Sequence, residues 1–191
     1  MEKYPKAVVF DLDYTLWPCW CDTHIRVPIK SVSPTEIVDR SGMKLSFYPD
    51  VESILLELFD NGIKIIGASR TAAPEIARKI LTLLHIRDKP AITYFHSLQW
   101  GQGSKIKHIQ SAAKQLNLLQ ELQQGYFVLY DDELRNRDVV SINCHFAHIP
   151  DETVGITKQI FLNELKLWSK FLEQVEKQQS AARKQRQIQL V

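Results

Sequence analysis

Residues 7–18 read AVVFDLDYTLWP, and this stretch decides the fold prediction. Its first four residues, Ala7 to Phe10, form an unbroken apolar run that stops at Asp11. A short run that is apolar on both faces is typical of a buried parallel strand, because helices cover such a strand on both sides. We therefore expect Asp11 to lie at the carboxyl end of a strand within an α/β sheet.

Helical and extended patterns alternate along the rest of the chain. Helices are expected at residues 51–59 (capped by Asp50), 74–84, 104–116 and from about 153 onward, where apolar residues recur with helical spacing. Further strands are expected at residues 63–68, 126–130 and 144–149. Strands alternating with helices predict right-handed βαβ units. The predicted class is α/β, with three Rossmann-like layers: a mostly parallel sheet and helices on both faces.

One domain is predicted for residues 1–175. Residues 17–48 interrupt the alternation with prolines, aromatic residues and short extended pieces. About 30 residues are too few for an independent domain, so we expect a minimal flap-type cap insertion there. Residues 176–191 are rich in Gln, Lys and Arg without an apolar stripe, and they are expected to form a polar C-terminal tail, either a frayed helix or a solvated segment.

The composition favours a globular protein that binds neither nucleic acid nor membrane. Of the 191 residues, 45% are hydrophobic and 24% charged, and the formal net charge of +2 is too small to attract a polyanion. No apolar run approaches the roughly 20 residues that span a bilayer. Three cysteines without a secretory signal suggest free thiols in a reducing compartment, so a cytoplasmic or nuclear location is expected.

Polar residues follow three of the predicted strands. Asp11 and Asp13 follow the first, Ser69 the second, and Asp131 with Asp132 the third, while Lys105 opens the helix after Gly103-Ser104. In open α/β sheets, ligands bind outside the carboxyl ends of the strands, so these segments should converge. Each motif alone has a simpler explanation as a turn, a helix cap or a surface charge. Their order and placement together favour a catalytic site.

These segments resemble the four motifs of the haloacid dehalogenase superfamily. The resemblance rests on Asp11-Leu12-Asp13-Tyr14-Thr15-Leu16-Trp17-Pro18, Ser69-Arg70-Thr71, Gly103-Ser104-Lys105 and Asp131-Asp132-Glu133. With Cys21-Asp22-Thr23-His24 downstream, the chain is similar to the magnesium-dependent phosphatase branch, the eukaryotic acid phosphatases with a very small cap. The resemblance covers residues 4–150.

The resemblance implies a Mg²⁺ cofactor and a role for each matched residue. Asp11 would bind the metal and act as the nucleophile, and Asp13 would give its backbone carbonyl to the metal and its side chain as general acid and base. A further metal ligand lies in the pair Asp131-Asp132, with Asp132 favoured for direct contact. The implied substrate-binding residues are Leu12, Asp13, Ser69, Arg70 and Lys105. Clustered carboxylates also suit Mg²⁺ on chemical grounds, since it prefers oxygen ligands.

A small cap predicts an open site and bulky substrates. The resemblance implies a phosphoric monoester hydrolase acting on phosphotyrosine and other aryl phosphates, or on protein-linked sugar phosphates such as fructosamine phosphates. The expected partner is a phosphorylated small molecule or a phosphoprotein, and the tail is a candidate contact for an unknown protein. A phosphotransferase and a non-catalytic module that binds phosphorylated partners remain as alternatives. Dehalogenation is disfavoured because it needs no acid at Asp13.

Some residues keep two interpretations. Arg70 either clamps an anionic or polar group of the substrate or pairs with Glu75 on the next helix. Trp17, Trp20 and Trp100 either line the mouth of the site or pack the flap on the sheet, and packing is favoured. Thr15 is expected to support its loop. Cysteine and histidine spacing argues against structural zinc, and glycine spacing argues against a nucleotide cofactor.

Overall fold

The computed structural model describes residues 4–188, and of residues 186–188 only the backbone. Its centre is a five-stranded sheet with the order β10-β9-β1-β5-β8, in which every pairing is parallel. The strands are β1 (Ala7–Phe10), β5 (Lys64–Ser69), β8 (Ser97–Trp100), β9 (Phe127–Asp131) and β10 (Cys144–His148). The α/β prediction is confirmed, although the edge strand β8 was not expected.

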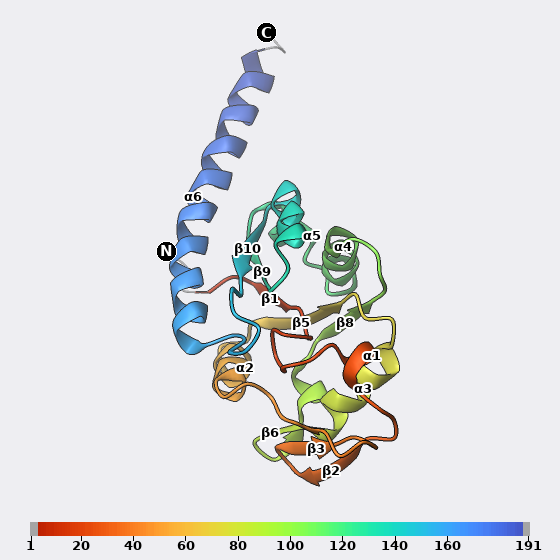
Figure 1. The fold of residues 1–191 in the computed structure, drawn as a ribbon. Coiled ribbons are helices and arrows are strands. Elements are labelled where there is room, and N and C mark those ends of the chain that lie inside the picture. Colours follow the sequence, from red (N-terminus) through yellow and green to blue (C-terminus); the bar gives the residue numbers. More distant parts are fainter. Residues whose placement is uncertain (1–3, 189–191) are drawn as a thin grey trace.

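Helices cover both faces of this sheet (Figure 1). One face packs against α2 (Val51–Asp60), α3 (Pro74–Leu83) and α6 (Lys158–Ile188). The other packs against α4 (Lys105–Gln115), α5 (Leu119–Gln123) and the 3₁₀ segment η2 (Leu134–Ile142). Val8 and Phe10 point into the first core, and Ala7 and Val9 into the second, as the two-residue period of a strand requires. Three layers result.

The insertion after β1 forms a short helix and a small antiparallel sheet. Helix α1 (Cys21–His24) is followed by β2 (Lys30–Ser33), β3 (Glu36–Val38) and β4 (Lys44–Leu45), paired in that order. A hairpin of β6 (His85–Ile86) and β7 (Lys89–Pro90) lies beside it, with a 2.7 Å hydrogen bond from His85 N to Pro34 O, and the 3₁₀ turn η1 (Ala91–Tyr94) follows. The insertion is therefore a flap of short strands.

The sequence predicts that the Asp50 side chain caps α2, but in the structure it makes no capping hydrogen bond. Its backbone is already close to helical, with φ −92° and ψ −5°, whereas a capping residue is usually extended. The Asp50 carboxylate instead accepts a 2.8 Å hydrogen bond from Lys158 N at the first turn of α6. Helix α6 also begins later than expected, because Thr157 Oγ1 accepts from Ile160 N at 3.1 Å. Asp50 therefore joins two distant helices.

The loop before α6 packs under the segment that follows β1. Ile156 N donates a 3.1 Å hydrogen bond to Thr15 O, and the Tyr48 hydroxyl donates to Glu152 O. Gly155 has φ +64°, and a Cβ added there would lie 2.1 Å from the Tyr48 ring. Only glycine combines this backbone angle with this close approach.

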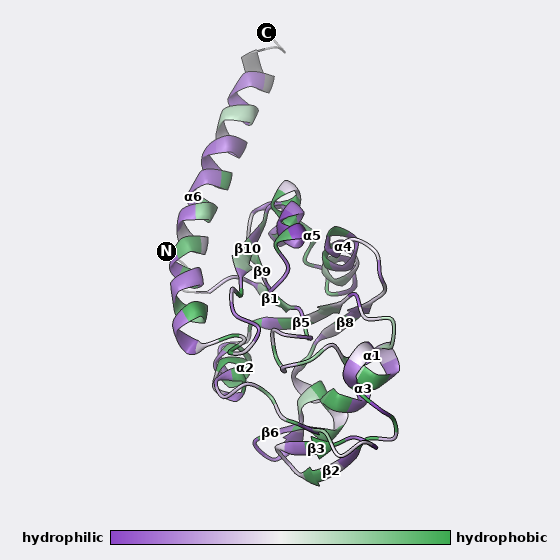
Figure 2. Cartoon of the chain, viewed as in Figure 1, coloured by the Kyte–Doolittle hydropathy of each residue, from purple (hydrophilic) through white to green (hydrophobic). Residues whose placement is uncertain are grey.

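Helix α6 runs without a break through residue 176, where the sequence predicts a polar tail to start. Its buried residues are Phe161, Leu165, Trp168, Leu172 and Val175. Beyond them the helix extends past the body of the protein and is mostly hydrophilic (Figures 1 and 2). Residues 189–191 of the predicted tail lie outside the described residues. Among the described helices, none has both the length and the apolar content needed to cross a bilayer.

Candidate active site

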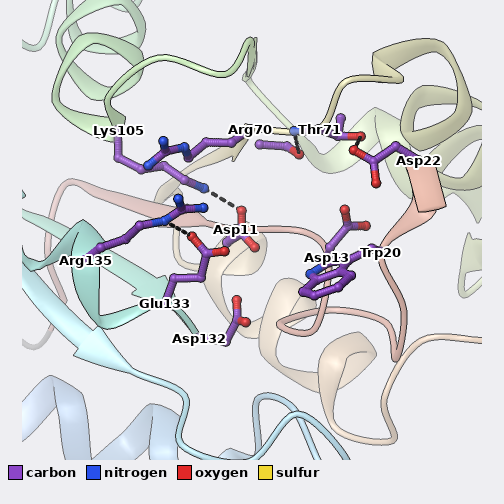
Figure 3. A pocket seen from close by; sticks show the side chains of 11 residues that line it. Asp11, Asp13, Trp20, Asp22, Arg70, Thr71, Lys105, Asp132, Glu133 and Arg135 are labelled. Carbon is purple, nitrogen blue, oxygen red and sulfur yellow. Dashed lines mark hydrogen bonds and ion pairs between the residues drawn. The ribbon is translucent and has the colours of Figure 1, made fainter. Parts of the chain in front are cut away.

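Three carboxylates meet at the carboxyl ends of the two central strands. Asp11 follows β1, Asp131 ends β9 and Asp132 comes next, and one oxygen of each lies within 4.8 Å of the others. The register explains this meeting, because Phe10 pairs with Tyr130 and Asp11 N donates to Tyr130 O at 2.9 Å. Asp11 and Asp132 border a cavity of about 240 Å³ (Figure 3). It is lined by Asp11, Asp13, Trp20, Asp22, Ser69, Arg70, Thr71, Lys105, Asp132, Glu133 and Arg135.

Lys105 supplies a buried ammonium beside the nucleophile candidate. It is the first residue of α4, and the preceding Ser104 caps the helix by accepting from Ile106 N at 3.1 Å. Its Nζ donates to Asp11 Oδ1 and Ala68 O and lies 3.3 Å from Asp131 Oδ2. Burial opposes the positive charge, but Asp11 and Asp131 outweigh it and raise the pKa of Lys105. Lys105 therefore remains charged at neutral pH.

Asp131 and Asp132 have different surroundings. Asp131 is fully buried, and it accepts from Glu133 N at 2.8 Å and from Asn136 Nδ2 at 2.9 Å. Asp132 is half-buried and lines the cavity. Burial and the neighbouring charges of Asp131 and Glu133 raise the pKa of Asp132 to about 7. Asp132 is thus the carboxylate with access to a cation, and Asp131 supports the cluster from behind.

The carboxylate cluster fits a magnesium ion. Burial raises the pKa of Asp11 well above its usual value, and Asp131 and Asp132 raise it further against the opposing effect of Lys105. Three close carboxylates therefore exceed the charge that one ammonium can balance. A hard divalent cation with oxygen ligands would supply the missing charge. Asp11, Asp132 and the backbone carbonyl of Asp13 are the groups that would hold it.

Asp13 is arranged to carry a proton. Its Oδ1 accepts from Trp17 Nε1 at 2.7 Å and from Cys21 N at 3.2 Å, whereas Oδ2 accepts only from the Cys21 thiol, a weak donor, at 3.6 Å. In the neutral acid the proton therefore belongs on Oδ2. Burial outweighs these hydrogen bonds and raises the pKa of Asp13 to about 6. The side chain is held in place by a tight turn in which Tyr14 has φ +58° and donates from N to Trp17 O at 2.8 Å.

The loop after β5 presents donors to the cavity. Thr71 N donates to Ser69 Oγ at 3.2 Å, which leaves the Ser69 hydroxyl proton available to a ligand. Asp22 holds this loop from α1: its Oδ2 accepts from Ala72 N at 2.9 Å and from Thr71 Oγ1 at 3.3 Å. Burial opposes the charge of Asp22, but these bonds outweigh it and lower the pKa of its carboxyl.

Arg70 lines the cavity, as expected if it binds a group of the substrate. It donates from one terminal nitrogen to Asn136 Oδ1 at 3.2 Å and from the other to Gln102 O at 3.3 Å. These bonds aim the guanidinium away from α3, so the alternative of a surface pair with Glu75 is wrong. The Leu12 side chain, in contrast, is fully buried in the core and does not line the cavity.

The tryptophans divide between the two interpretations. Trp17 is fully buried and packs against Phe47, as expected. Trp20 is 48% exposed and lines the cavity next to Asp13 (Figure 3). Its indole stacks on the His24 ring, with ring centroids 5.8 Å apart. The preference for packing was wrong for Trp20, because α1 turns its indole outward. Thr15 is fully buried away from the cavity, in agreement with a supporting role.

Several lining or supporting residues were missed from the sequence. They are Asp22, Thr71, Glu133, Arg135 and the buried Asn136. Asp22 and Thr71 stood within quoted motifs, and the hydrogen bond between them was the missing information. Asn136 lies four residues after Asp132 in η2, and no local pattern indicated that its amide turns back toward the sheet.

Comparison with known proteins gives both sequence and structural relatives. Residues 3–171 match the family described as Acid Phosphatase. A putative magnesium-dependent phosphatase of Saccharomyces cerevisiae is 38% identical over 174 residues, covering 86% of this chain and 98% of the relative. Magnesium-dependent phosphatase 1 of Homo sapiens is 33% identical over 171 residues, covering 89% and 90%.

Solved structures share the fold at low identity. A haloacid dehalogenase superfamily hydrolase from Ehrlichia chaffeensis aligns with a TM-score of 0.56 and 13% identity, covering 90% of this chain and 100% of that chain. The phosphatase domain of a Bacteroides fragilis protein, solved with Mg, aligns with a TM-score of 0.54 and 16% identity, covering 85% and 40%. These structures support the three-layer α/β architecture.

Proposed function

The chain belongs to the acid phosphatase family, and from this membership we propose that it is a magnesium-dependent phosphatase that hydrolyses phosphate monoesters through a phosphorylated Asp11. The observation that carries the proposal is the position of Asp11. Its carboxylate lies at the floor of the cavity, bonded to the buried ammonium of Lys105, and the protonatable Asp13 stands two residues further along.

The first half of the reaction transfers the phosphoryl group to Asp11. Ser69, Arg70 and Lys105 donate hydrogen bonds to the phosphoryl oxygens and balance their charge. Asp11 Oδ1 is bonded to Lys105, so the other oxygen attacks phosphorus. The new bond joins this oxygen to phosphorus, the ester P–O bond breaks, and Asp13 Oδ2 gives its proton to the leaving oxygen.

The second half restores the enzyme. Asp13, now ionised, takes a proton from a water molecule as the water oxygen attacks phosphorus. The bond between Asp11 and phosphorus breaks, inorganic phosphate forms, and Asp13 is again a neutral acid. Bound Mg²⁺, held by Asp11, Asp132 and the Asp13 carbonyl, would supply positive charge that reduces repulsion between the carboxylates and the substrate.

The leaving group has a defined neighbour. Because Asp13 must reach the leaving oxygen, that group lies beside the half-exposed indole of Trp20. Of the inserted residues 17–48, only Trp20 and Asp22 line the cavity, so bulky leaving groups can extend outward. Flat groups that stack on an indole fit best, which favours aryl phosphates such as phosphotyrosine. Sugar phosphates can also pack the C–H face of their puckered rings against the indole. The substrates are then phosphorylated small molecules or phosphoproteins.

Trapping the intermediate tests the mechanism. The wild type is mixed with an aryl phosphate and Mg²⁺, quenched in acid within one turnover and digested with trypsin. Mass spectrometry should find the phosphoryl group on the tryptic peptide of residues 7–26, and Asp11→Asn should not become labelled. Turnover by the wild type without any labelled peptide, or label on another residue, would refute the mechanism.

A substrate panel tests the leaving-group assignment. Trp20→Leu should lower kcat/KM for aryl phosphates about fivefold relative to alkyl phosphates, because it removes an aromatic stacking surface. Trp100→Leu is the matched control, since Trp100 lies outside the cavity lining and faces Arg78. Equal losses on aryl and alkyl phosphates would remove the stacking role from Trp20.

A further inference from the structure

One buried amide joins the two sides of the catalytic cavity. Asn136 is 2% exposed and belongs to η2. Its Nδ2 donates to Asp131 Oδ2 at 2.9 Å, and its Oδ1 accepts from the guanidinium of Arg70 at 3.2 Å. A flipped amide would place its oxygen against a carboxylate and its NH₂ against a guanidinium. The two neighbours therefore allow only one orientation of this side chain.

We infer that Asn136 is a positioning residue that holds Arg70 over the phosphate site while leaving its charge available to the substrate. The inference rests on the proposed function. Arg70 has a long side chain that would otherwise lose rotamer freedom when it binds phosphate. Asn136 and the carbonyl of Gln102 fix both of its terminal nitrogens before the substrate arrives.

The chemistry of the anchor matters as much as its position. Both hydrogen-bond partners of Arg70 are neutral oxygens, so neither of these bonds pairs its guanidinium with a carboxylate. Arg135, which lines the same cavity, differs from Arg70 because its partner is charged: its Nε donates to the carboxylate of Glu133. The Arg135 side chain is also 59% exposed. An arginine held by an amide keeps its full attraction for a phosphate, whereas one held by a carboxylate has lost much of it.

The other end of Asn136 links this anchor to the carboxylate cluster. Asp131 Oδ2 accepts a hydrogen bond from Asn136 Nδ2 and lies 3.3 Å from Lys105 Nζ. The same Lys105 Nζ donates to Asp11 Oδ1. A continuous chain of contacts therefore runs from Arg70 through Asn136, Asp131 and Lys105 to Asp11. Removing Asn136 leaves Asp131 with Glu133 N and Lys105, so the cluster should survive while Arg70 loses its anchor.

The test measures binding of inorganic phosphate, the reaction product, by calorimetry in the presence of Mg²⁺. Asn136→Leu, of similar size but without hydrogen bonds, should bind phosphate about tenfold more weakly and raise KM by a similar factor, with a smaller change in kcat. In an Arg70→Ala background the same substitution should change phosphate binding less than about twofold, because the residue through which it acts is gone.

Controls separate positioning from general damage. Asn163→Leu, an exposed asparagine on α6, should behave as wild type, and thermal unfolding should show that each variant folds. If Asn136→Leu does not fold, Asn136→Ser, which keeps a smaller polar group, takes its place. Wild-type phosphate binding by Asn136→Leu, or an equal loss with and without Arg70, would overturn the inference. Failure of the wild type to hydrolyse any ester would refute the proposed function instead. The two failures are distinguishable because phosphate binding is measured by calorimetry without turnover.

Discussion

The floor and the rim of the cavity are built in different ways. On the floor, Asp11 and Lys105 are each at most 9% exposed, with the buried Asp131 behind them, and all three are positioned by paired parallel strands and the first turn of a helix. On the rim, Trp20, Asp22 and Arg135 are exposed and come from short segments held by a few side-chain bonds. A floor fixed by backbone register suits chemistry that tolerates little displacement, and a rim of this kind can change with the substrate.

The largest effect is expected for Asp11→Asn on the floor. Turnover of an aryl phosphate should fall by about 10⁴-fold or more, because the nucleophile is lost. Stability should stay equal or rise, since one charge leaves a buried cluster of carboxylates. Steady-state kinetics and thermal unfolding measure the two effects. Near-native activity would remove Asp11 from its assigned role.

Removing the metal should act on the floor almost as strongly. Chelation of divalent ions should reduce turnover by about 10³-fold or more, and added Mg²⁺ should restore it, because the carboxylate cluster would otherwise repel the substrate. Asp132→Asn should raise the Mg²⁺ concentration needed for half-maximal activity. Full activity in chelator would contradict the metal role of Asp11 and Asp132.

Asp13→Asn should lower kcat by about 10²- to 10³-fold. The pH profile gives the sharper test. Asp13 must carry its proton to act as an acid, and burial raises its pKa to about 6, so wild-type kcat/KM should fall as pH rises through that region. Below this pKa the acid is present; above it the acid is lost, with a slope of about tenfold per pH unit.

The Asp13→Asn variant should not show this fall in kcat/KM with rising pH, since asparagine does not titrate. Rates are measured from mildly acidic to neutral pH at saturating Mg²⁺. If kcat/KM of Asp13→Asn falls with rising pH as in the wild type, the titrating group is not Asp13. The general acid would then be one of the other carboxylates of the cavity.

A rim residue should produce a smaller effect that depends on its hydrogen bonds. Asp22→Ala removes the acceptor of Ala72 N and should raise KM about fivefold, whereas Asp22→Asn keeps an acceptor and should stay within about twofold of wild type. Glu75→Ala, an exposed acid in the first turn of α3, is the control. Equal losses in both Asp22 variants would mean that its charge, rather than its bonding to the loop, matters.

The smallest effect is expected for Arg135→Gln, also on the rim. Its ion pair with Glu133 is largely exposed, and pairs of this kind contribute about 0–1 kcal/mol to stability. Thermal unfolding should be nearly unchanged, and kcat/KM should change less than about threefold. A loss as large as that of Asp13→Asn would place Arg135 among the residues that contact the phosphoryl group and would blur the difference between floor and rim.

The difference between floor and rim also determines which site residues the sequence could predict. Each of these floor and support residues ends a strand, follows one or opens a helix, and topology alone brings such positions together; they are Asp11, Ser69, Lys105 and Asp131. Asn136 and Trp20 depend on the path of short irregular segments, for which no periodic pattern exists. Asp50 shows the limit within regular structure: the sequence predicts its position at the helix start, but its carboxylate bonds a residue 108 positions away.

The close fit of Gly155 beneath Tyr48 limits how this family can vary. Any side chain at position 155 would need both an unfavourable backbone angle and the space taken by the aromatic ring. The neighbouring Ile156 supports the Thr15 carbonyl, so a shift there would reach the turn that carries Asp13. A relative with any larger residue at position 155 should therefore carry a residue smaller than tyrosine at position 48.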